Sequence, residues 1–308
     1  MSETAISVSI VIVNYNVKDL LLACLNSLNK YLLPTIKIET VLVDNNSKDG
    51  SIEAVKQDFP NVIIIENKFN AGFPVANNQA FQIAKGDYIF MLNPDAELIE
   101  DALSKLINYM EQHDEISLIA PMLLNTDGSR QLSVWREPKF KYLFYEVHYM
   151  NGFLKEKHYA DKDLTKPFEA ECFSGAAILF RKNVFDKIGM LDEKMFWIED
   201  TEFCYRAFHA GLKLLYYPDA KVLHHIGQSA KLNYNISISN QIFNKIKFYK
   251  KHHSTFAWMM VVLLSFYHVV IKIIVFGLLA PFNKVYFRKA KAYLYTLPRV
   301  FNPPIGIN

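Results

Sequence analysis

Short apolar runs alternate with amphipathic stretches along the first half of the chain. Four apolar, largely β-branched runs predict buried strands at Ser7–Val13, Glu39–Val43, Val62–Glu66 and Tyr88–Leu92. Apolar residues at helical spacing predict helices at Leu20–Leu28, Ser51–Asp58, Ala76–Lys85 and Ala102–Met110. Asn16 is the expected N-cap of the first of these helices. Strands that alternate with short helices predict an α/β fold with a Rossmann-like, mainly parallel central sheet.

The second half of the chain gives a more mixed pattern. Its predicted elements are a strand, a helix that Gly211 ends, and two strands around a turn at Pro218-Asp219, in the order Ala176–Arg181, Glu199–Ala210, Lys213–Tyr217 and Lys221–His224.

Polar residues follow each of the four strands predicted in the first half. They are Asn14-Tyr15-Asn16, Asp44-Asn45-Asn46-Ser47, Asn67 with Asn70 and Gly72, and Asn93-Pro94-Asp95. Ligands of open parallel sheets bind beyond the carboxyl ends of the strands, so these residues are expected at one binding edge. One such loop would be ordinary, because Asn, Asp and Gly are common in turns. Four at the same edge predict a ligand site.

Composition indicates a folded, intracellular protein. The 308 residues are 51% hydrophobic, which is enough for a large core and argues against disorder. The three cysteines are too few and too scattered for a disulfide framework or a zinc site. The first residues have no basic run followed by an apolar core, so no signal peptide is expected, and a reducing cytosolic setting fits best.

Charge divides the chain into two regions. Residues 231–308 hold 11 of the 34 basic residues and no acidic residue. The remaining 23 basic residues and all 31 acidic residues lie in the first 230, which therefore carry a net charge of −8. This predicts a catalytic domain at residues 1–230 and a basic, apolar helical tail at residues 231–308 that faces a polyanion.

The tail holds two long apolar runs, Phe256–Ile271 and Ile273–Phe282, separated by Lys272. Together they are long enough to span a bilayer if Lys272 and His268 are tolerated there. Basic clusters on both sides give no clear orientation, so an interfacial or re-entrant helix pair on the cytoplasmic membrane face is preferred. The alternative is a buried helical pair or a dimer interface. Such apolar content argues against nucleic acid as the polyanion.

Seven segments spread over roughly residues 8–229 match a known family in order and spacing. They read VSIVIVNYN, VLVDNNSKDGS, NKFNAGFPVANN, GDYIFMLNPDAEL, SGAAILFRK, FWIEDTEFCYRAFHAGLKLLYYPDA and HHIGQSA. They resemble glycosyltransferase family 2, which implies a GT-A type fold. The most similar branch contains bacterial rhamnosyltransferases of surface-polysaccharide assembly.

The resemblance implies a divalent metal, Mg²⁺ or Mn²⁺, at the leaving diphosphate of a nucleotide sugar. Asp95 is the expected metal-binding carboxylate. The family often has Asp-x-Asp where this chain has Asn93-Pro94-Asp95, so Asn93 offers only a neutral oxygen or a contact to the donor. His224, of an His-x-x-Gly pattern, is the second expected ligand, with His225 as the alternative. Adjacent side chains on a strand point to opposite faces, so at most one faces the site.

The resemblance also assigns the acceptor chemistry to Glu199-Asp200, with Asp200 as the general base in a single, inverting displacement. Acidic residues at a helix start are otherwise ordinary caps. The expected donor contacts are Asn14, Tyr15, Asp44, Asn70, Gly72, Asn77 and Asn93. Trp197 is expected either to wall the acceptor sugar or to pack in the core.

Thymidine-diphosphate rhamnose is the first expected donor, and uridine-diphosphate sugars come next. The expected acceptor is a lipid-linked or polysaccharide glycan, and a homo-oligomer is an open alternative. A processive synthase would show Gln-x-x-Arg-Trp after Asp200, which this chain lacks. A nucleotidyltransferase would place a glycine-rich loop after the first strand, where Asn14-Tyr15-Asn16-Val17 stands. A non-catalytic nucleotide-sugar-binding or scaffold protein is the remaining alternative.

Overall fold

A computed structural model describes residues 6–31, 36–225 and 234–304. The chain forms two compact units. The sheet unit comprises Met1–Glu137, Lys157–Asp192 and Asp200–Ser229, and the helical unit comprises Pro138–Glu156, Glu193–Glu199 and Ala230–Asn308. The helical unit thus includes two segments that precede residue 231, the predicted start of the tail. The division of the chain into two domains at residue 230 stays a prediction.

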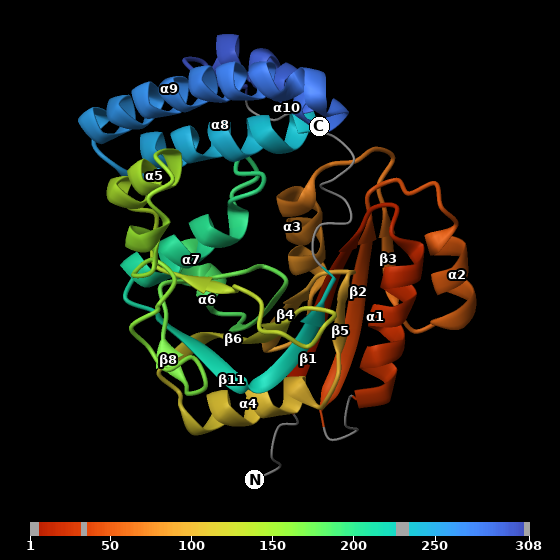
Figure 1. The fold of residues 1–308 in the computed structure, drawn as a ribbon. Coiled ribbons are helices and arrows are strands. Elements are labelled where there is room, and N and C mark those ends of the chain that lie inside the picture. The colour runs from red at the N-terminus through yellow and green to blue at the C-terminus, as the bar shows by residue number, and fades with distance from the viewer. Residues whose placement is uncertain (1–5, 32–35, 226–233, 305–308) are drawn as a thin grey trace. The chain divides into compact units, whose positions relative to one another are not determined.

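The sheet unit is built on one large mixed sheet (Figure 1). Its strands are β1 Ser7–Asn14, β2 Lys37–Asp44, β3 Ile63–Glu66, β4 Tyr88–Leu92, β5 Ala96–Leu98, β6 Ile116–Leu124, β8 Phe168–Glu169, β10 Ala177–Arg181 and β11 Lys213–His224. Two short strands, β7 Val134–Trp135 and β9 Cys172–Phe173, pair with each other separately. The helices are α1 Lys18–Tyr31, α2 Ser51–Asp58, α3 Phe73–Ile83, α4 Ala102–Gln112, α6 Val184–Ile188 and α7 Glu199–His209.

The strand order places a switch point in the sheet. The order is β3-β2-β1-β4-β10-β6-β11-β5, with β8 beside β11. Strands β1 to β4 are parallel, β6 and β11 run the same way, and β5, β8 and β10 run against them. The chain moves outward from β1 to β3 and then returns to β4 on the other side of β1. Such a reversal opens a crevice at the carboxyl ends of β1 and β4, where α/β proteins bind ligands.

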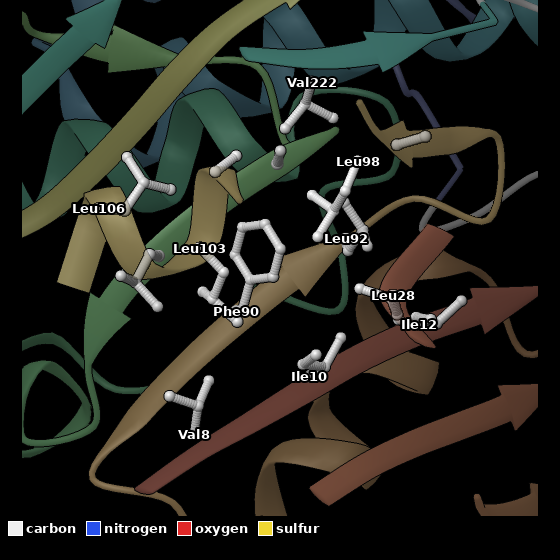
Figure 2. Close-up of a cluster of buried hydrophobic side chains, with 14 of the residues drawn as sticks. Val8, Ile10, Ile12, Leu28, Phe90, Leu92, Leu98, Leu103, Leu106 and Val222 are labelled. Carbon is white, nitrogen blue, oxygen red and sulfur yellow. The ribbon is translucent and has the colours of Figure 1, made fainter. Parts of the chain in front are cut away.

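Alternating side chains of the strands build a core on each face of the sheet. Val8, Ile10 and Ile12 of β1 join one cluster, which α1, α2 and α4 cover. Val11 and Val13 point the other way, into a cluster that α3, α6 and α7 cover. Figure 2 shows the first cluster, in which the β1 side chains lie near those of β4, α1 and α4. The predicted α/β class is therefore confirmed.

The two strands predicted at the end of the sheet unit are one strand, so that prediction is wrong. β11 runs without a break from Lys213 to His224, and its register against β6 shifts between Tyr217 and Lys221. Pro218 falls in this shift. Proline has no N–H to donate to a ladder, and an irregular register tolerates it without ending the strand.

The predicted cap of α1 is also wrong. Asn16 has a φ of 53°, and its side chain accepts a hydrogen bond from the backbone N–H of Lys48 at 2.7 Å. The backbone N–H of Lys18, at the start of α1, donates instead to Asp49 at 2.8 Å. The sequence pattern missed this because the capping carboxylate comes from a distant loop.

The helical unit contains three longer helices that pack along one another (Figure 1). They are α8 Tyr234–His252, α9 Thr255–Leu279 and α10 Lys284–Thr296, accompanied by α5 Phe140–Val147 and the short turns η1 Asn151–Leu154, η3 Ala280–Phe282 and η4 Leu297–Arg299. Ser254 caps α9 by accepting from the N–H of Ala257 at 3.3 Å, and Asn283 caps α10 by accepting from Val285 at 2.8 Å.

The predicted helix pair interrupted at Lys272 is wrong, because α9 continues through that residue. The ammonium of Lys272 lies 4.5 Å from the ring centroid of Tyr149 and 5.3 Å from that of Phe276. Ring faces attract a cation, so these contacts accommodate the charge within a continuous helix.

Candidate functional site

The ends of β1 and β2 form a buried polar cluster. The side-chain amide nitrogen of Asn14, with two hydrogens to donate, lies within hydrogen-bond distance of three oxygens: Asp44 Oδ1 at 2.9 Å, Ser47 Oγ at 3.0 Å and Ser51 Oγ at 2.8 Å. Asp44 Oδ2 accepts the backbone N–H of Ser47 at 2.8 Å. Asn14 is fully buried, and its Oδ1 has no hydrogen-bond partner among the residues that the structure describes. The cluster therefore fixes the Asp44 carboxylate.

A second polar cluster connects the end of β2 to the start of α3. Asn45 Oδ1 accepts from the amide of Asn67 at 2.9 Å, and Asn67 exchanges two hydrogen bonds with Gln79 at 2.9 and 3.0 Å. Asn70 Oδ1 accepts the N–H of Gly72 at 3.0 Å. Gly72 has a φ of 88°, as expected for a glycine needed at a helix start. These contacts hold the loop that follows β3.

Two residues expected to contact the donor occupy different settings. Asn77 lies in α3, is 1% exposed and donates to the carbonyl of Phe73 at 2.9 Å. Tyr15, directly after β1, is 42% exposed. The role of either in binding a donor stays a prediction.

The ends of β4 and β11 bring Asn93, Asp95 and His224 together. His224 Nε2 lies 3.3 Å from Asp95 Oδ1 and 3.5 Å from the Asn93 amide nitrogen. The strand register explains this meeting, because His224 pairs with Ala96, the residue after Asp95. The neighbouring His225 instead places Nε2 2.6 Å from Glu97 Oε1. The two histidines thus contact different carboxylates, and the one near Asp95 is His224.

These three residues fit the ligand set of a divalent cation. Asp95 supplies a carboxylate and His224 an imidazole. The side chain of Asp95 is only 15% exposed and that of His224 only 11%. Asn93 Oδ1 is buried and has no hydrogen-bond partner in the described part of the chain, so it is an unsatisfied oxygen on the residue whose amide nitrogen faces His224. Among the described residues no cluster of three or more His, Cys, Asp or Glu side chains could hold a metal. The remaining coordination would therefore fall to the amide and to substrate oxygens. Gly227, of the His-x-x-Gly pattern, lies outside the described residues.

Asp200 lies at the start of α7 and contacts Gly175, which comes shortly before β10. Its Oδ2 accepts the N–H of Gly175 at 2.8 Å, and its Oδ1 accepts the N–H of Thr201 at 2.6 Å. Burial raises the pKa of this carboxyl, and the backbone N–H groups of Gly175 and Thr201 partly oppose the rise. The Thr201 hydroxyl also donates to Oδ1 at 3.2 Å, so Oδ2 is the oxygen that retains a lone pair to accept a proton.

Gly175 permits the approach of Asp200. A Cβ added at Gly175 would lie 3.1 Å from Asp200 Cβ, 3.4 Å from Met91 Cε and 3.5 Å from Asp200 Oδ2. Any larger residue at this position would push the carboxylate away. Glu199, the first residue of α7, and Trp197 fall in a segment of the helical unit. Trp197 is 38% exposed and has a φ of 83°, which is unusual for a bulky residue.

A family model described as glycosyl transferase family 2 matches residues 9–189, which is more than half of the chain. The chain belongs to glycosyl transferase family 2. This family model covers β1 to β4 and β10, and therefore covers Asp44, Asp95 and Gly175.

Curated relatives of this family 2 chain transfer sugars, according to their names. It is 26% identical over 211 residues to the N-acetylglucosaminyl-diphospho-decaprenol L-rhamnosyltransferase of Mycobacterium tuberculosis, covering 62% of this chain and 68% of that protein. It is 26% identical over 194 residues to the dTDP-rhamnosyl transferase RfbF of Shigella flexneri, covering 62% and 61%. It is 36% identical over 110 residues to the poly(ribitol-phosphate) beta-glucosyltransferase of Bacillus spizizenii, covering 34% and 17%. The chain thus spans only part of each relative.

Solved glycosyltransferase structures share the fold. The mannosyltransferase PcManGT from Pyrobaculum calidifontis, in complex with GDP-Man and Mn²⁺, matches with a TM-score of 0.57 at 13% identity, covering 96% of this chain and 87% of that one. GalNAc-T7 with UDP, GalNAc and Mn²⁺ matches with a TM-score of 0.57 at 16% identity, covering 84% and 57%. The predicted GT-A type fold is therefore confirmed.

Two residues of this family 2 site were missed in the sequence reasoning. Gly175 holds Asp200, and Gln131 contacts His224 with Oε1 2.7 Å from Nδ1. Gly175 follows a serine directly before a predicted strand, which is a detectable signal. Gln131 follows the turn around Gly128, and no periodic pattern distinguishes it from other turn residues.

Proposed function

We propose that this chain is an inverting, non-processive, metal-dependent glycosyltransferase that moves a sugar from a nucleoside diphosphate to a lipid-linked or polysaccharide acceptor. The observation that carries the proposal is that Asp44 ends β2 while Asp95, after β4, contacts His224 at the end of β11, all in the sheet unit that also holds Asp200. Family membership supports the same activity.

The carboxyl edge of β1 and β2 is the proposed nucleotide site. Asp44 is held by Asn14 and Ser47, so its carboxylate is already oriented before a ligand arrives. A carboxylate accepts hydrogen bonds from a pyrimidine N–H or from ribose hydroxyls. Preorganised acceptors of this kind favour a thymidine or uridine diphosphate sugar.

Asp95 and His224 are the proposed metal ligands, with Asn93 as a neutral oxygen beside them. Mg²⁺ or Mn²⁺ bound there would neutralise the charge of the departing nucleoside diphosphate. An imidazole ligand favours Mn²⁺ over Mg²⁺.

Asp200 is the proposed general base, with Glu199 beside it in the chain. An acceptor hydroxyl attacks the anomeric carbon, its proton passes to the Asp200 carboxylate, and the bond from that carbon to the diphosphate oxygen breaks. A single displacement of this kind inverts the anomeric configuration. Burial raises the pKa of Asp200, which strengthens its ionised form as a proton acceptor.

Rhamnose is the proposed sugar and a polyprenyl-linked glycan the proposed acceptor. Two relatives are named as rhamnosyltransferases, one of them acting on N-acetylglucosaminyl-diphospho-decaprenol by its name. Another, from Escherichia coli, is named as a glucosyltransferase of a GlcNAc-diphosphoundecaprenol and is 36% identical over 106 residues. An acceptor with a lipid anchor would keep the enzyme at the cytoplasmic face of the inner or plasma membrane.

The helical unit supports attachment to that membrane. α9 and η3 together are long and apolar enough to cross a bilayer, and only 28% of their most apolar window is buried. α9 packs lengthwise on α8 and α10, which carry Lys245, Lys247, Arg288 and Lys289. A spanning α9 would draw these cations into the hydrocarbon at about 2.5–3.5 kcal/mol for each central charge. We therefore favour a helix that lies in the membrane surface with its apolar face inserted.

A screen of nucleotide sugars tests the proposed function. The purified full chain should gain thermal stability from a thymidine or uridine diphosphate sugar, and more in the presence of Mn²⁺. It should then transfer the sugar to a polyprenyl-diphosphate N-acetylglucosamine with inverted configuration, as read by NMR of the product. Donor binding without transfer or donor hydrolysis would instead support the non-catalytic, nucleotide-sugar-binding alternative.

A further inference from the structure

Gln131 lies in a buried position beside the proposed metal ligands and is not used by the mechanism above. It is 6% exposed, and its backbone N–H donates to the carbonyl of Leu123 in β6 at 2.8 Å. Its side-chain nitrogen donates to the carbonyl of His224 at 3.1 Å and to Asn125 Oδ1 at 3.1 Å. Its oxygen faces His224 Nδ1 at 2.7 Å. Gln131 therefore uses both ends of its amide on one histidine.

A chain of hydrogen bonds fixes which end of the Gln131 amide faces the ring. It begins at the Asp127 carboxylate, which only accepts, so the Ser129 hydroxyl donates to it at 2.6 Å. Ser129 Oγ then accepts from the Asn125 amide nitrogen at 2.9 Å, which turns Asn125 Oδ1 toward the Gln131 nitrogen. The Gln131 oxygen is left to face His224 Nδ1, which must carry the proton of that hydrogen bond.

We propose that Gln131 is a positioning residue that holds His224 in its Nδ1–H tautomer and thereby presents the unprotonated Nε2 to Asp95. Nε2 and Asp95 Oδ1 lie 3.3 Å apart, so in the neutral ring two acceptor atoms face each other. A divalent cation held by His224 and Asp95 would satisfy both atoms. Histidine ligands of metal sites commonly donate their other ring N–H to a fixed acceptor, which sets tautomer and ring orientation. The metal part of this inference rests on the proposed function.

The tautomer itself can be measured on the wild-type chain. Long-range ¹⁵N–¹H correlation spectra of the full chain with ¹⁵N-labelled histidine, recorded at alkaline pH, distinguish the protonated ring nitrogen. His224→Gln assigns the signal by its disappearance. We expect a proton on Nδ1 and none on Nε2. A dominant Nε2–H signal for His224 would overturn the proposal without reference to any variant.

Mn²⁺ affinity gives the second readout, followed by the loss of the free-Mn²⁺ resonance in electron paramagnetic resonance titrations. Gln131→Met keeps the length of the side chain but removes the acceptor, so Kd should rise by about 10–100-fold. Gln131→Glu retains an oxygen for Nδ1–H but loses the donors to Asn125 Oδ1 and the His224 carbonyl, so its Kd should rise less than that of Gln131→Met. Glu97→Gln, the matched control beside His225, should leave Kd unchanged. Wild-type affinity in Gln131→Met, or equal loss in Gln131→Glu, would contradict the proposal.

Failure of the metal proposal can be told apart from failure of this inference. If wild type and Asp95→Asn bind Mn²⁺ equally weakly, the metal site is rejected. The tautomer spectra of wild type and Gln131→Glu then test the role of Gln131 independently of the metal. A His224 ring protonated on Nε2, or a mixture of the two tautomers, would reject that role.

Discussion

The carboxyl edge of the sheet and the outer face of α9 are surfaces of opposite construction. At the sheet edge the polar side chains are buried among hydrogen-bond partners, as Asn14 illustrates with an amide nitrogen within hydrogen-bond distance of three oxygens. On α9 the apolar side chains are exposed, with Phe256 at 74% and Leu278 at 71%. Buried polar groups need partners, and exposed apolar groups leave water when a partner covers them.

This difference predicts separate roles for the two regions. The sheet edge would carry out the reaction, and the apolar face of α9 would determine where the protein binds. Groups whose orientation is fixed before binding can stabilise a transition state at little reorganisation cost, which is what the sheet edge offers. A broad apolar face flanked by cations binds through area and charge rather than through single contacts. Substitutions in one region should therefore leave the other function intact, and each prediction below tests that separation.

The largest effect is expected for Asp200→Asn. An amide cannot take the proton of the acceptor hydroxyl, so kcat should fall by about 10²–10⁴-fold in a transfer assay with the purified chain. Donor stabilisation and vesicle binding should stay at wild-type levels, which are the internal controls. Transfer at the wild-type rate would remove Asp200 from the mechanism.

A somewhat smaller loss is expected when the proposed metal site is damaged. Asp95→Asn removes the only carboxylate that contacts His224 in the described part of the chain, so Mn²⁺ affinity should weaken by at least about tenfold. Transfer by wild type should disappear in excess chelator and return when Mn²⁺ is added. Lipid binding should not respond to chelator. Full transfer in chelator would show that diphosphate departure needs no cation here.

The apolar face of α9 is tested by Phe256→Ser with Leu278→Ser. Withdrawing a Phe or Leu from an apolar phase costs about 1.5–3 kcal/mol, so each change should weaken partition to phosphatidylglycerol vesicles by about tenfold or more. High salt should weaken binding without abolishing it. Donor stabilisation should not change.

Ile63→Ser, on the edge strand β3 of the sheet unit, is the matched control for this experiment because Ile63 is also exposed, at 40%. Light scattering of the same proteins measures their oligomeric state. It therefore tests the alternative, in which a second copy of the chain covers the apolar face of α9. If the double variant turned an oligomer into a monomer while flotation with vesicles stayed the same, the face would be a subunit interface rather than a membrane surface.

The elements that the sequence predicts well are those whose signals are local. Tyr88–Leu92 is predicted and observed as β4, because a run of apolar residues between turns needs no distant partner to be read. Lys272 shows the opposite case. A lysine inside an apolar run predicts an interruption, but the rings of Tyr149 and Phe276 accept the ammonium, and α9 continues. Contacts between segments far apart in the chain are invisible to periodicity.

The site follows the same rule. Asp44 directly follows one predicted strand and Asp95 lies three residues beyond the end of another, so their shared edge could be predicted. The choice between His224 and His225 depends on the pairing of His224 with Ala96, which only the fold supplies. Gln131 could not be predicted at all, because its proposed role depends on a hydrogen-bonded turn that the sequence pattern does not distinguish from an ordinary loop.

The smallest expected effect concerns the glycine that holds Asp200. In Gly175→Ala the new Cβ would press on Asp200 Cβ from 3.1 Å, so the carboxylate must shift by a few tenths of an ångström. We expect kcat to fall by about tenfold, because small misplacements of a catalytic group are costly. Gly152→Ala is the matched control, since nothing lies within 4 Å of its Cβ position.

The pH dependence of Gly175→Ala distinguishes this cause from a general loss of stability. Asp200 must be ionised to act as the base, so activity falls as pH drops through its pKa, which burial already raises above the ordinary value for aspartate. The N–H of Gly175 stabilises the ionised form, and a weakened bond therefore raises the pKa further. The acid limb of the kcat profile should move to higher pH in Gly175→Ala and stay in place in Gly152→Ala. An unmoved limb with reduced kcat would mean that Gly175 acts through packing and not through the Asp200 carboxylate.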